Sequence, residues 1–187
     1  MHYLSFDVGI KNLAYCISTE QGEIIEWDII NLNKNDKKKQ SIIELSEVMY
    51  IELNDKFKEH DIDYVLIENQ PVMKNPVMKS VQMLLYSFFV YLKTVERKYI
   101  SHIAFVSATS KNTYCKNLNI ELDVTPKNKY AFNKKLAIKC VEHILTMNKY
   151  EEALHFFNTN KKKDDLSDSY LQSLSYIEMN KKKKTKK

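Results

Sequence analysis

Glycine and proline are scarce in this chain. Of its 187 residues only two are glycine, Gly9 and Gly22, and only three are proline. A Walker A loop and a dinucleotide-binding GxGxxG loop each need several glycines close together, and the two glycines here are too far apart for either. We therefore expect no nucleotide cofactor and no glycine-rich phosphate-binding loop.

Cysteine pairs and long apolar segments are also missing. The three cysteines lie far apart and form no CxxC motif, so neither a zinc site nor a disulfide framework is indicated. The first residues contain an acid at position 7 and no apolar leader. The longest apolar stretch, 81–92, contains Gln82 and Ser87 and is too short to span a bilayer. We expect a soluble, intracellular protein with no membrane partner.

Basic residues are in excess. The net charge is +5 and the pI is about 8.9, with lysine runs at 37–39, 161–163 and 181–184. A basic chain favours polyanionic partners, and nucleic acid before others. Lysine runs are also often nothing more than solvated segments, so charge alone leaves both interpretations open.

Hydrophobic periodicity predicts an α/β fold. Short apolar segments predict strands at 3–6, 13–18, 23–30, 64–67 and 103–106, and apolar residues at helical spacing predict helices at 42–57, 77–92, 134–147 and 164 to about 179. The segment 107–125 reads as irregular. Three antiparallel strands followed by alternating helices and strands give a five-stranded mixed sheet flanked by helices, the ribonuclease H-like arrangement. We expect one nuclease-type domain, 1–180, and a basic tail, 181–187.

The segment 77–92 is apolar on nearly every side. One face carries seven apolar residues, and Met83, Tyr86, Val90 and Tyr91 extend the apolar surface around the helix. A helix of this kind is either deeply buried or part of an oligomer interface. In so small a protein we favour a homodimer contact.

Four acidic residues stand at the ends of predicted elements. Asp7 ends the first strand and Glu68 ends the fourth, while Asp165 and Asp168 share one face of the last helix. The first and fourth strands are neighbours in this strand order, so Asp7 and Glu68 should lie side by side. The last helix can then bring the other two acids to the same sheet edge.

A cluster of carboxylates requires a cation to offset its repulsion and desolvation. Oxygen ligands select hard ions such as Mg²⁺ or Mn²⁺, and four carboxylates suit two ions roughly 3.5–4 Å apart, with Asp7 between them. Gly9 would let the turn after Asp7 approach a substrate phosphate. Taken singly, an acid such as Asp7 is usually a turn residue, and Asp165 is more often an N-cap; all four acids together favour the metal site.

Three segments carry a family resemblance. SFDVGIKNLAY at 5–15, IENQP at 67–71 and DDLSDS at 164–169 resemble the RuvC-like Holliday junction resolvases. The poxvirus branch is most similar, and the fungal mitochondrial resolvases look similar too. Asp7 lies in the D-x-G-x-K-N motif, Glu68 in E-x-Q-P, and Asp165 with Asp168 in D-x-x-D. The family spacing selects Asp165, and not Asp164, as the partner of Asp168.

The resemblance implies a metal-dependent endodeoxyribonuclease. Such an enzyme binds four-way DNA junctions as a homodimer and makes paired symmetric nicks by two-metal-ion hydrolysis, which resolves recombination and replication intermediates, including concatemers. It uses Mg²⁺, with Mn²⁺ as a substitute. A poxvirus-like origin would place it at viral replication sites in the host cytoplasm.

The resemblance also implies further site residues. Lys134 and Lys135 match a lysine pair of the family, from which we take Lys135 as the catalytic candidate and Lys134 as a DNA contact. Other expected DNA contacts are Lys11, Asn12, Gln70 and Lys74. Asn69 departs from the arginine that relatives often carry between the motif's Glu and Gln.

Two alternatives remain open at this stage. One is a nuclease of the same fold that acts more broadly on branched DNA or on RNA–DNA hybrids. The other is a catalytically inactive nucleic-acid-binding module. An actin-like ATP-binding protein also begins with a similar motif, but it needs glycine-rich loops that this chain lacks.

Overall fold

The computed structural model describes residues 1–34, 40–73, 75–122 and 128–184. Its strands are β1 (His2–Asp7), β2 (Leu13–Thr19), β3 (Ile24–Ile30), β4 (Tyr64–Glu68) and β5 (His102–Val106). Its helices are α1 (Ile42–Phe57), α2 (Pro76–Thr94), α3 (Ser110–Asn117), α4 (Lys129–Met147), α5 (Glu151–Thr159) and α6 (Lys163–Lys184). None of the described helices is long and apolar enough to cross a membrane.

The five strands form one mixed sheet in the order β3-β2-β1-β4-β5. β1 pairs antiparallel with β2 and parallel with β4, so that Phe6 lies between Tyr15 and Ile67. The predicted antiparallel meander and the adjacency of the first and fourth strands are both confirmed. Asp7 and Glu68 therefore leave the sheet at the same edge.

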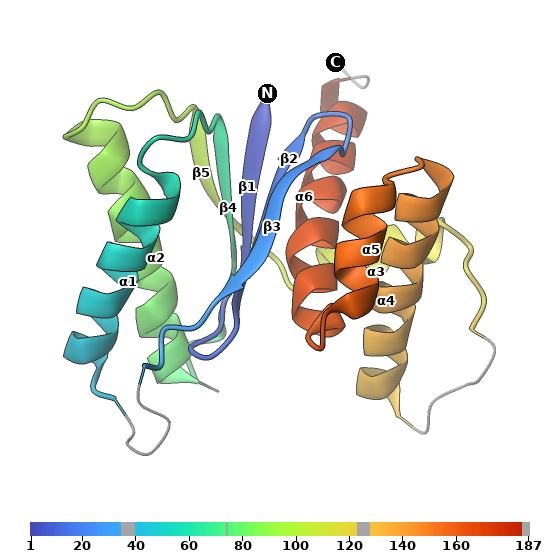
Figure 1. Cartoon of the computed structure of the whole chain (residues 1–187), viewed down its shortest axis with the longest axis horizontal. Helices are drawn as coiled ribbons and strands as arrows, with labels where there is room; N and C mark the ends of the chain where they lie inside the picture. Colours follow the sequence, from blue (N-terminus) through green and yellow to red (C-terminus); the bar gives the residue numbers. More distant parts are fainter. Residues whose placement is uncertain (35–39, 74, 123–127, 185–187) are drawn as a thin grey trace.

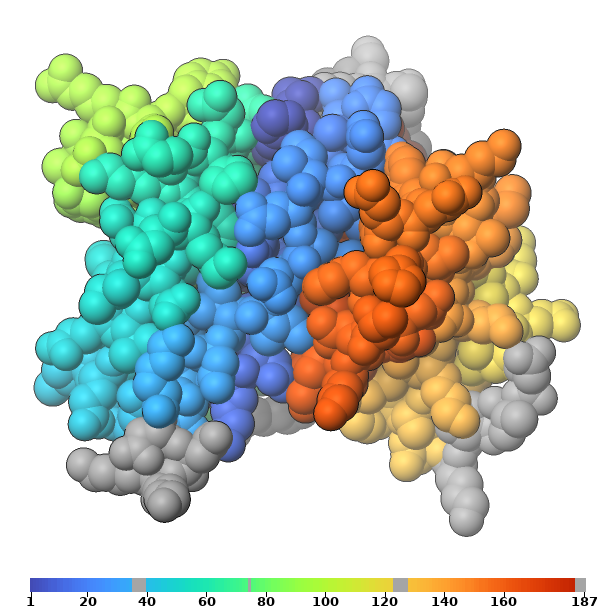
Figure 2. All heavy atoms as spheres, viewed as in Figure 1, coloured from blue at the N-terminus to red at the C-terminus, as the bar shows by residue number. Residues whose placement is uncertain are grey.

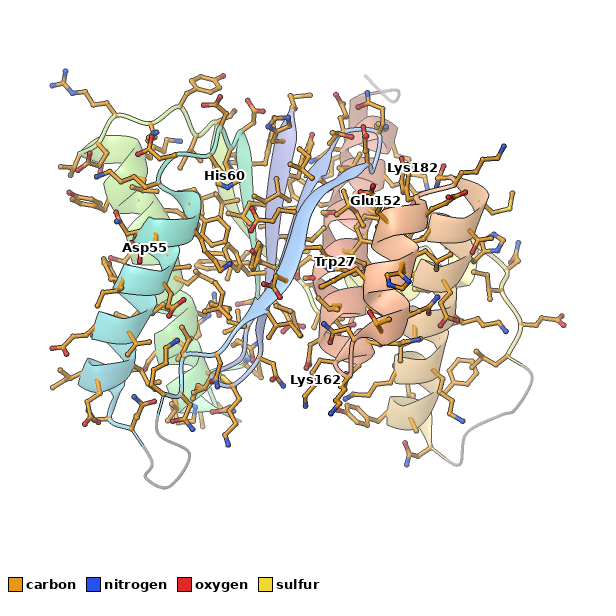
Figure 3. All side chains as sticks on the ribbon, in the orientation of Figure 1. Trp27, Asp55, His60, Glu152, Lys162 and Lys182 are labelled. Carbon is orange, nitrogen blue, oxygen red and sulfur yellow. The ribbon has the colours of Figure 1, made fainter. Side chains whose placement is uncertain are left out.

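Helices cover both faces of the sheet (Figure 1). α1 and α2 lie on one face, and α3 to α6 lie on the other. In the space-filling view, β3 is visible at the surface between α1 and α5 (Figure 2). Trp27 on β3 points toward the α5–α6 side (Figure 3), where its ring stacks on Phe157 with centroids 5.2 Å apart.

The core under α1 and α2 is apolar and rich in aromatic rings. Phe6 from β1, Phe57 from α1 and Phe89 from α2 meet there, with ring centroids 5.5–6.2 Å apart. α1 begins with a capping box in which Ser41 and Glu44 bond each other's backbone, which satisfies N–H groups that have no partner within the helix. Strong local signals and a clear apolar face explain why the predicted bounds 42–57 are confirmed.

α6 packs on the opposite face through apolar side chains such as Tyr170 and Leu171 and also through small polar ones. Its buried polar residues are Ser167, Ser169, Gln172, Ser173 and Ser175. Ser173 and Ser18 of β2 share a hydrogen bond of 3.0 Å between their hydroxyls. Small side chains let the helix approach the sheet closely, and their hydrogen bonds offset the cost of burying the hydroxyls.

Several predicted bounds differ from the structure. Part of 107–125 forms α3, which buries only Cys115 of its own residues and so gives almost no apolar periodicity. α5 went unpredicted, and α4 begins at Lys129, five residues before 134, because Asn128 caps it. α6 continues to Lys184, into the segment expected to be a tail. In each case tertiary packing or a helix cap determines where the helix forms and ends, which helix propensity alone does not specify.

Candidate functional site

The alternation of β1 turns Asp7 toward α6. Leu4 and Phe6 pack in the core under α1 and α2, so residues 3, 5 and 7 face the other way. Ser5 confirms this direction, because its hydroxyl accepts a hydrogen bond from Gln172 of α6. In β4 the same alternation buries Val65 and Ile67 in the α1–α2 core and turns Glu68 toward α6.

Gln172 fixes α6 over the two acidic strand ends. Its side-chain amide donates to Ser5 Oγ at 2.9 Å, to the Phe6 carbonyl at 3.1 Å and to the Leu66 carbonyl at 3.3 Å. Asp168 lies one helical turn earlier on the same face. Because Gln172 bonds both strands just before Asp7 and Glu68, it brings Asp168 to those two acids.

These acids line one pocket of about 350 Å³ at the sheet edge. Its wall is made by Asp7, Glu68, Ala108, Lys111, Asn112, Tyr130, Asn133, Lys134, Asp164, Asp165 and Asp168. The four acids predicted as ligands therefore meet, and Asp164 joins them. Figure 3 labels Lys162 just before α6 begins and Lys182 near its other end, so the pocket lies at the Lys162 end.

Both oxygens of Glu68 have hydrogen-bond donors. The Gln70 side-chain amide donates to Oε2 at 2.6 Å, and the Lys111 ammonium lies 3.3 Å from Oε1. Gln70 is itself held in place, because its backbone N–H donates to Gln82 Oε1 at 2.8 Å. Gln70 was predicted as a DNA contact; in this structure its side chain orients Glu68.

Lys111 lies between two of the acids. Its ammonium is 2.6 Å from Asp168 Oδ2 as well as 3.3 Å from Glu68 Oε1, and only 12% of its side chain is exposed. Burial alone would lower the pKa of Lys111, but Asp168, Asp7 and Glu68 raise it above its usual value. Lys111 is therefore charged at neutral pH and offsets part of the negative charge of the pocket.

The pocket disfavours full ionisation of its acids. Burial raises the pKa of Asp7 well above its usual value; Lys111 opposes this rise, while Glu68 and Asp168 add to it. Burial likewise raises the pKa of Asp168, again against the effect of Lys111. The pKa of Asp165 is raised by burial and by neighbouring Asp164. One lysine does not neutralise this group of carboxylates.

Lys134 pairs with Asp164 at the rim of the pocket. Burial alone would raise the pKa of Asp164, but the bond to Lys134 lowers it below its usual value. The Lys134 ammonium also lies 5.1 Å from the centroid of the Tyr130 ring. Lys135, expected as the catalytic lysine, is exposed and does not line the pocket, because successive residues of a helix point about 100° apart.

Two of the remaining predicted DNA contacts, Lys11 and Asn12, lie outside the pocket wall. Lys11 is exposed and Asn12 half-buried, both in the turn that follows β1. A Cβ on Gly9 would lie 2.3 Å from the Asn12 carbonyl oxygen, so the turn itself requires glycine, whatever it binds. Lys74 lies outside the described residues.

The donor set of the pocket fits a hard divalent cation. Its acidic ligand candidates offer only oxygen atoms, which Mg²⁺ and Mn²⁺ prefer, and burial makes their uncompensated charge unfavourable. As they stand, no three histidine, cysteine, aspartate or glutamate side chains within the described ranges converge to hold an ion. In the pocket, the ammonium of Lys111 lies between Glu68 and Asp168.

Comparison with known sequences gives one viral relative. No protein-family profile matches the chain. An uncharacterised protein of Acanthamoeba polyphaga mimivirus is 32% identical over an alignment of 134 residues, and the alignment covers 66% of this chain. The chain spans about a third of the length of that relative. The more specific poxvirus resemblance stays a prediction.

Comparison with solved structures decides the fold. The yeast mitochondrial Holliday junction resolvase superposes with a TM-score of 0.65 over 94% of this chain and 78% of its own, at 23% identity. RuvC of Thermus thermophilus superposes with a TM-score of 0.60 over 96% of this chain and 97% of its own, at 12% identity. The chain has the RuvC-like, ribonuclease H-like fold. The predicted fold class is therefore confirmed.

On this RuvC-like fold, Lys111 is the main residue that the sequence did not indicate. It lies in the segment 107–125, which reads as irregular and polar. The one available signal was weak: Tyr114, Cys115 and Leu118 recur at helical spacing and would have suggested a short helix. Even that helix would not have placed Lys111 among acids from β4 and α6, because the contact depends on tertiary packing.

Proposed function

We propose that this protein is a metal-dependent endonuclease that resolves four-way DNA junctions. The observation that carries the proposal is the meeting of Asp7, Glu68, Asp165 and Asp168 in one pocket of a RuvC-like fold. Two further findings support it. The sequence motifs around these acids resemble those of the resolvases, and one structural neighbour is by name a Holliday junction resolvase.

The carboxylates of Asp7, Glu68, Asp165 and Asp168 would hold two Mg²⁺ ions, or Mn²⁺ in their place. When bound, such ions activate water for in-line attack on a phosphodiester and stabilise the leaving oxygen. Gln70 would keep Glu68 in a fixed orientation through its 2.6 Å hydrogen bond. Gln172 would keep Asp168 in register with the two strands.

Contacts with DNA would come from the lysines around the pocket. Lys134 is the nearest candidate, because it lines the pocket and 41% of its side chain is exposed. Lys11 and Asn12 remain proposed contacts with the phosphate backbone outside the pocket. Lys135, predicted as the catalytic lysine, would contact the backbone there instead, because it does not line the pocket. Binding that rests on lysine–phosphate contacts should weaken steeply as salt concentration rises.

We also propose that two copies associate through the face formed by α1 and α2. An apolar groove of about 480 Å³ lies there, lined by Ile42, Ile43, Ser46, Lys79, Ser80, Met83 and Leu84. On α2 itself, Met83 and Tyr91 leave 42% and 43% of their area exposed. A two-fold dimer would present two equivalent pockets to the two-fold junction. Sedimentation of the protein should give the mass of two chains; a monomer at micromolar concentration contradicts this.

The decisive experiment is cleavage of an end-labelled, immobile four-way junction in Mg²⁺. We expect paired symmetric nicks from the wild type, and a rate at least about a thousandfold lower from Asp7→Asn, which removes a ligand charge. Asp55→Asn is the matched control, because Asp55 lies on the exposed side of α1, away from the pocket (Figure 3). Asp55→Asn should cleave like the wild type.

Other outcomes select the alternatives. Cleavage of flaps or RNA–DNA hybrids without cleavage of junctions would support a broader nuclease of the same fold. Junction binding without any metal-dependent cleavage would support a binding module. Action at viral replication sites in the host cytoplasm rests on the poxvirus resemblance alone and stays a prediction.

A further inference from the structure

Lys111 is held where a metal ion would bind. Its ammonium contacts Asp168 at 2.6 Å and Glu68 at 3.3 Å, and Asp7 lines the same pocket. The lysine reaches these acids from α3, while the acids belong to β1, β4 and α6. The contact therefore joins α3 to the three elements that build the pocket.

An ammonium and a divalent ion compete for the same carboxylate oxygens. Mg²⁺ requires its ligands at about 2.0–2.1 Å, so an ion shared by Glu68 and Asp168 would lie where the lysine now makes its bonds. Like charges at such separations in a partly buried site also repel strongly. Within the described residues no three histidine, cysteine, aspartate or glutamate side chains converge to hold an ion, and Lys111 lies between two of the predicted ligands.

We propose that Lys111 is an internal counterion that occupies the metal site of the ion-free protein and releases Glu68 and Asp168 when a divalent ion binds. This inference rests on the proposed metal-dependent function and deepens it. The lysine stabilises the pocket before the ion arrives, because it offsets the repulsion among buried carboxylates. The ion must displace it, so Lys111 lowers the affinity of the pocket for the ion.

Lys134 provides the comparison within the same pocket. It is more exposed, 41% against 12%, and its partner is Asp164, which is outside the predicted ligand set. Removal of Lys134 should therefore leave the ligands and their geometry in place. The two lysines differ in which acid they hold, and that difference makes the inference testable.

The test measures binding of Mn²⁺ to the protein without DNA by titration calorimetry. A second measurement is thermal unfolding of the same proteins in EDTA. We expect Lys111→Met to bind Mn²⁺ at least about tenfold more tightly than the wild type, because a unit positive charge beside the ion is gone. In EDTA its unfolding temperature should be lower by roughly 5–10 °C, and saturating Mn²⁺ should remove most of that difference. Lys134→Met should bind Mn²⁺ within about threefold of the wild type.

Lys111→Gln is the second variant, because its amide retains N–H donors for the carboxylates without the charge. It should fold at least as well as Lys111→Met and show the same gain in Mn²⁺ affinity. Affinity equal to or weaker than that of the wild type in either folded variant would overturn the inference. Absence of Mn²⁺ binding in every protein, wild type included, would instead overturn the proposed metal site.

Discussion

On the α1–α2 side of the sheet the buried side chains are almost all aromatic or aliphatic, whereas α6 buries four serines and a glutamine. Apolar packing is roughly proportional to buried area and has no preferred direction. Hydrogen bonds require defined distances and angles. The α3–α6 side also has an apolar core, which includes Trp27, Phe157 and Tyr170. The first face therefore relies almost entirely on apolar packing, whereas the second adds to such packing the directional contacts that define the position of the acids. The pocket lies where α6 meets the sheet, on the side whose contacts are directional.

The largest effect should come from the apolar face. Phe89 is fully buried and contacts the rings of Phe6 and Phe57. We expect Phe89→Ala to reduce the free energy of unfolding by about 3–5 kcal/mol, measured by urea denaturation. Phe89→Leu is the control, and its free energy of unfolding should fall by less than half of that amount. Cleavage per folded molecule should stay at the wild-type level; a loss would show that this face also positions the site.

A smaller loss of stability, with a clear effect on the site, should come from the polar face. Gln172→Leu keeps the volume but leaves Ser5 Oγ and two strand carbonyls without their donor. We expect a loss of about 2–3 kcal/mol and weaker Mn²⁺ binding, because Asp168 is no longer held over Asp7 and Glu68. Calorimetry measures the second effect.

Ser173→Ala is the matched control for Gln172→Leu. Ser173 is buried on the same helix and bonds Ser18 at 3.0 Å, away from the acidic strand ends. It should cost about 1 kcal/mol and leave Mn²⁺ affinity unchanged. Equal Mn²⁺ affinities for the two variants would contradict the special position of Gln172.

The smallest effect concerns the pH dependence of the ion-free protein. The pKa of Asp7 is raised in the folded state, first by burial, so between the usual value of 3.8 and the raised value the folded protein binds more protons than the unfolded chain. Stability must then fall as pH rises through that window. Asp7→Asn removes this contribution. In EDTA the unfolding temperature of Asp7→Asn should increase relative to that of the wild type as pH rises. A difference between the two proteins that does not change with pH would contradict the raised pKa.

The acids of the site were predictable from the sequence, and the lysine among them was not. Asp7 and Glu68 follow short apolar strands, so their meeting required only the strand order. Helical spacing put Asp165 and Asp168 on one face, and the family resemblance selected Asp165 over Asp164. Lys111, by contrast, reaches the pocket from α3, a helix with almost no apolar face of its own. The family resemblance led us to take Lys135, and not Lys134, as the catalytic candidate. Only the orientation of α4 shows which of the two lysines lines the pocket.

The wide spacing of the pocket residues along the chain has a consequence during synthesis. Asp7, Glu68 and Lys111 leave the ribosome long before α6, whose Gln172 bonds a carbonyl of β1 and one of β4 beside the acids. A nascent or truncated chain that ends before Asp165 lacks half of the predicted ligands and the helix that aligns the rest. The pocket can therefore form only after nearly all of these residues have been translated, so no early fragment can carry it.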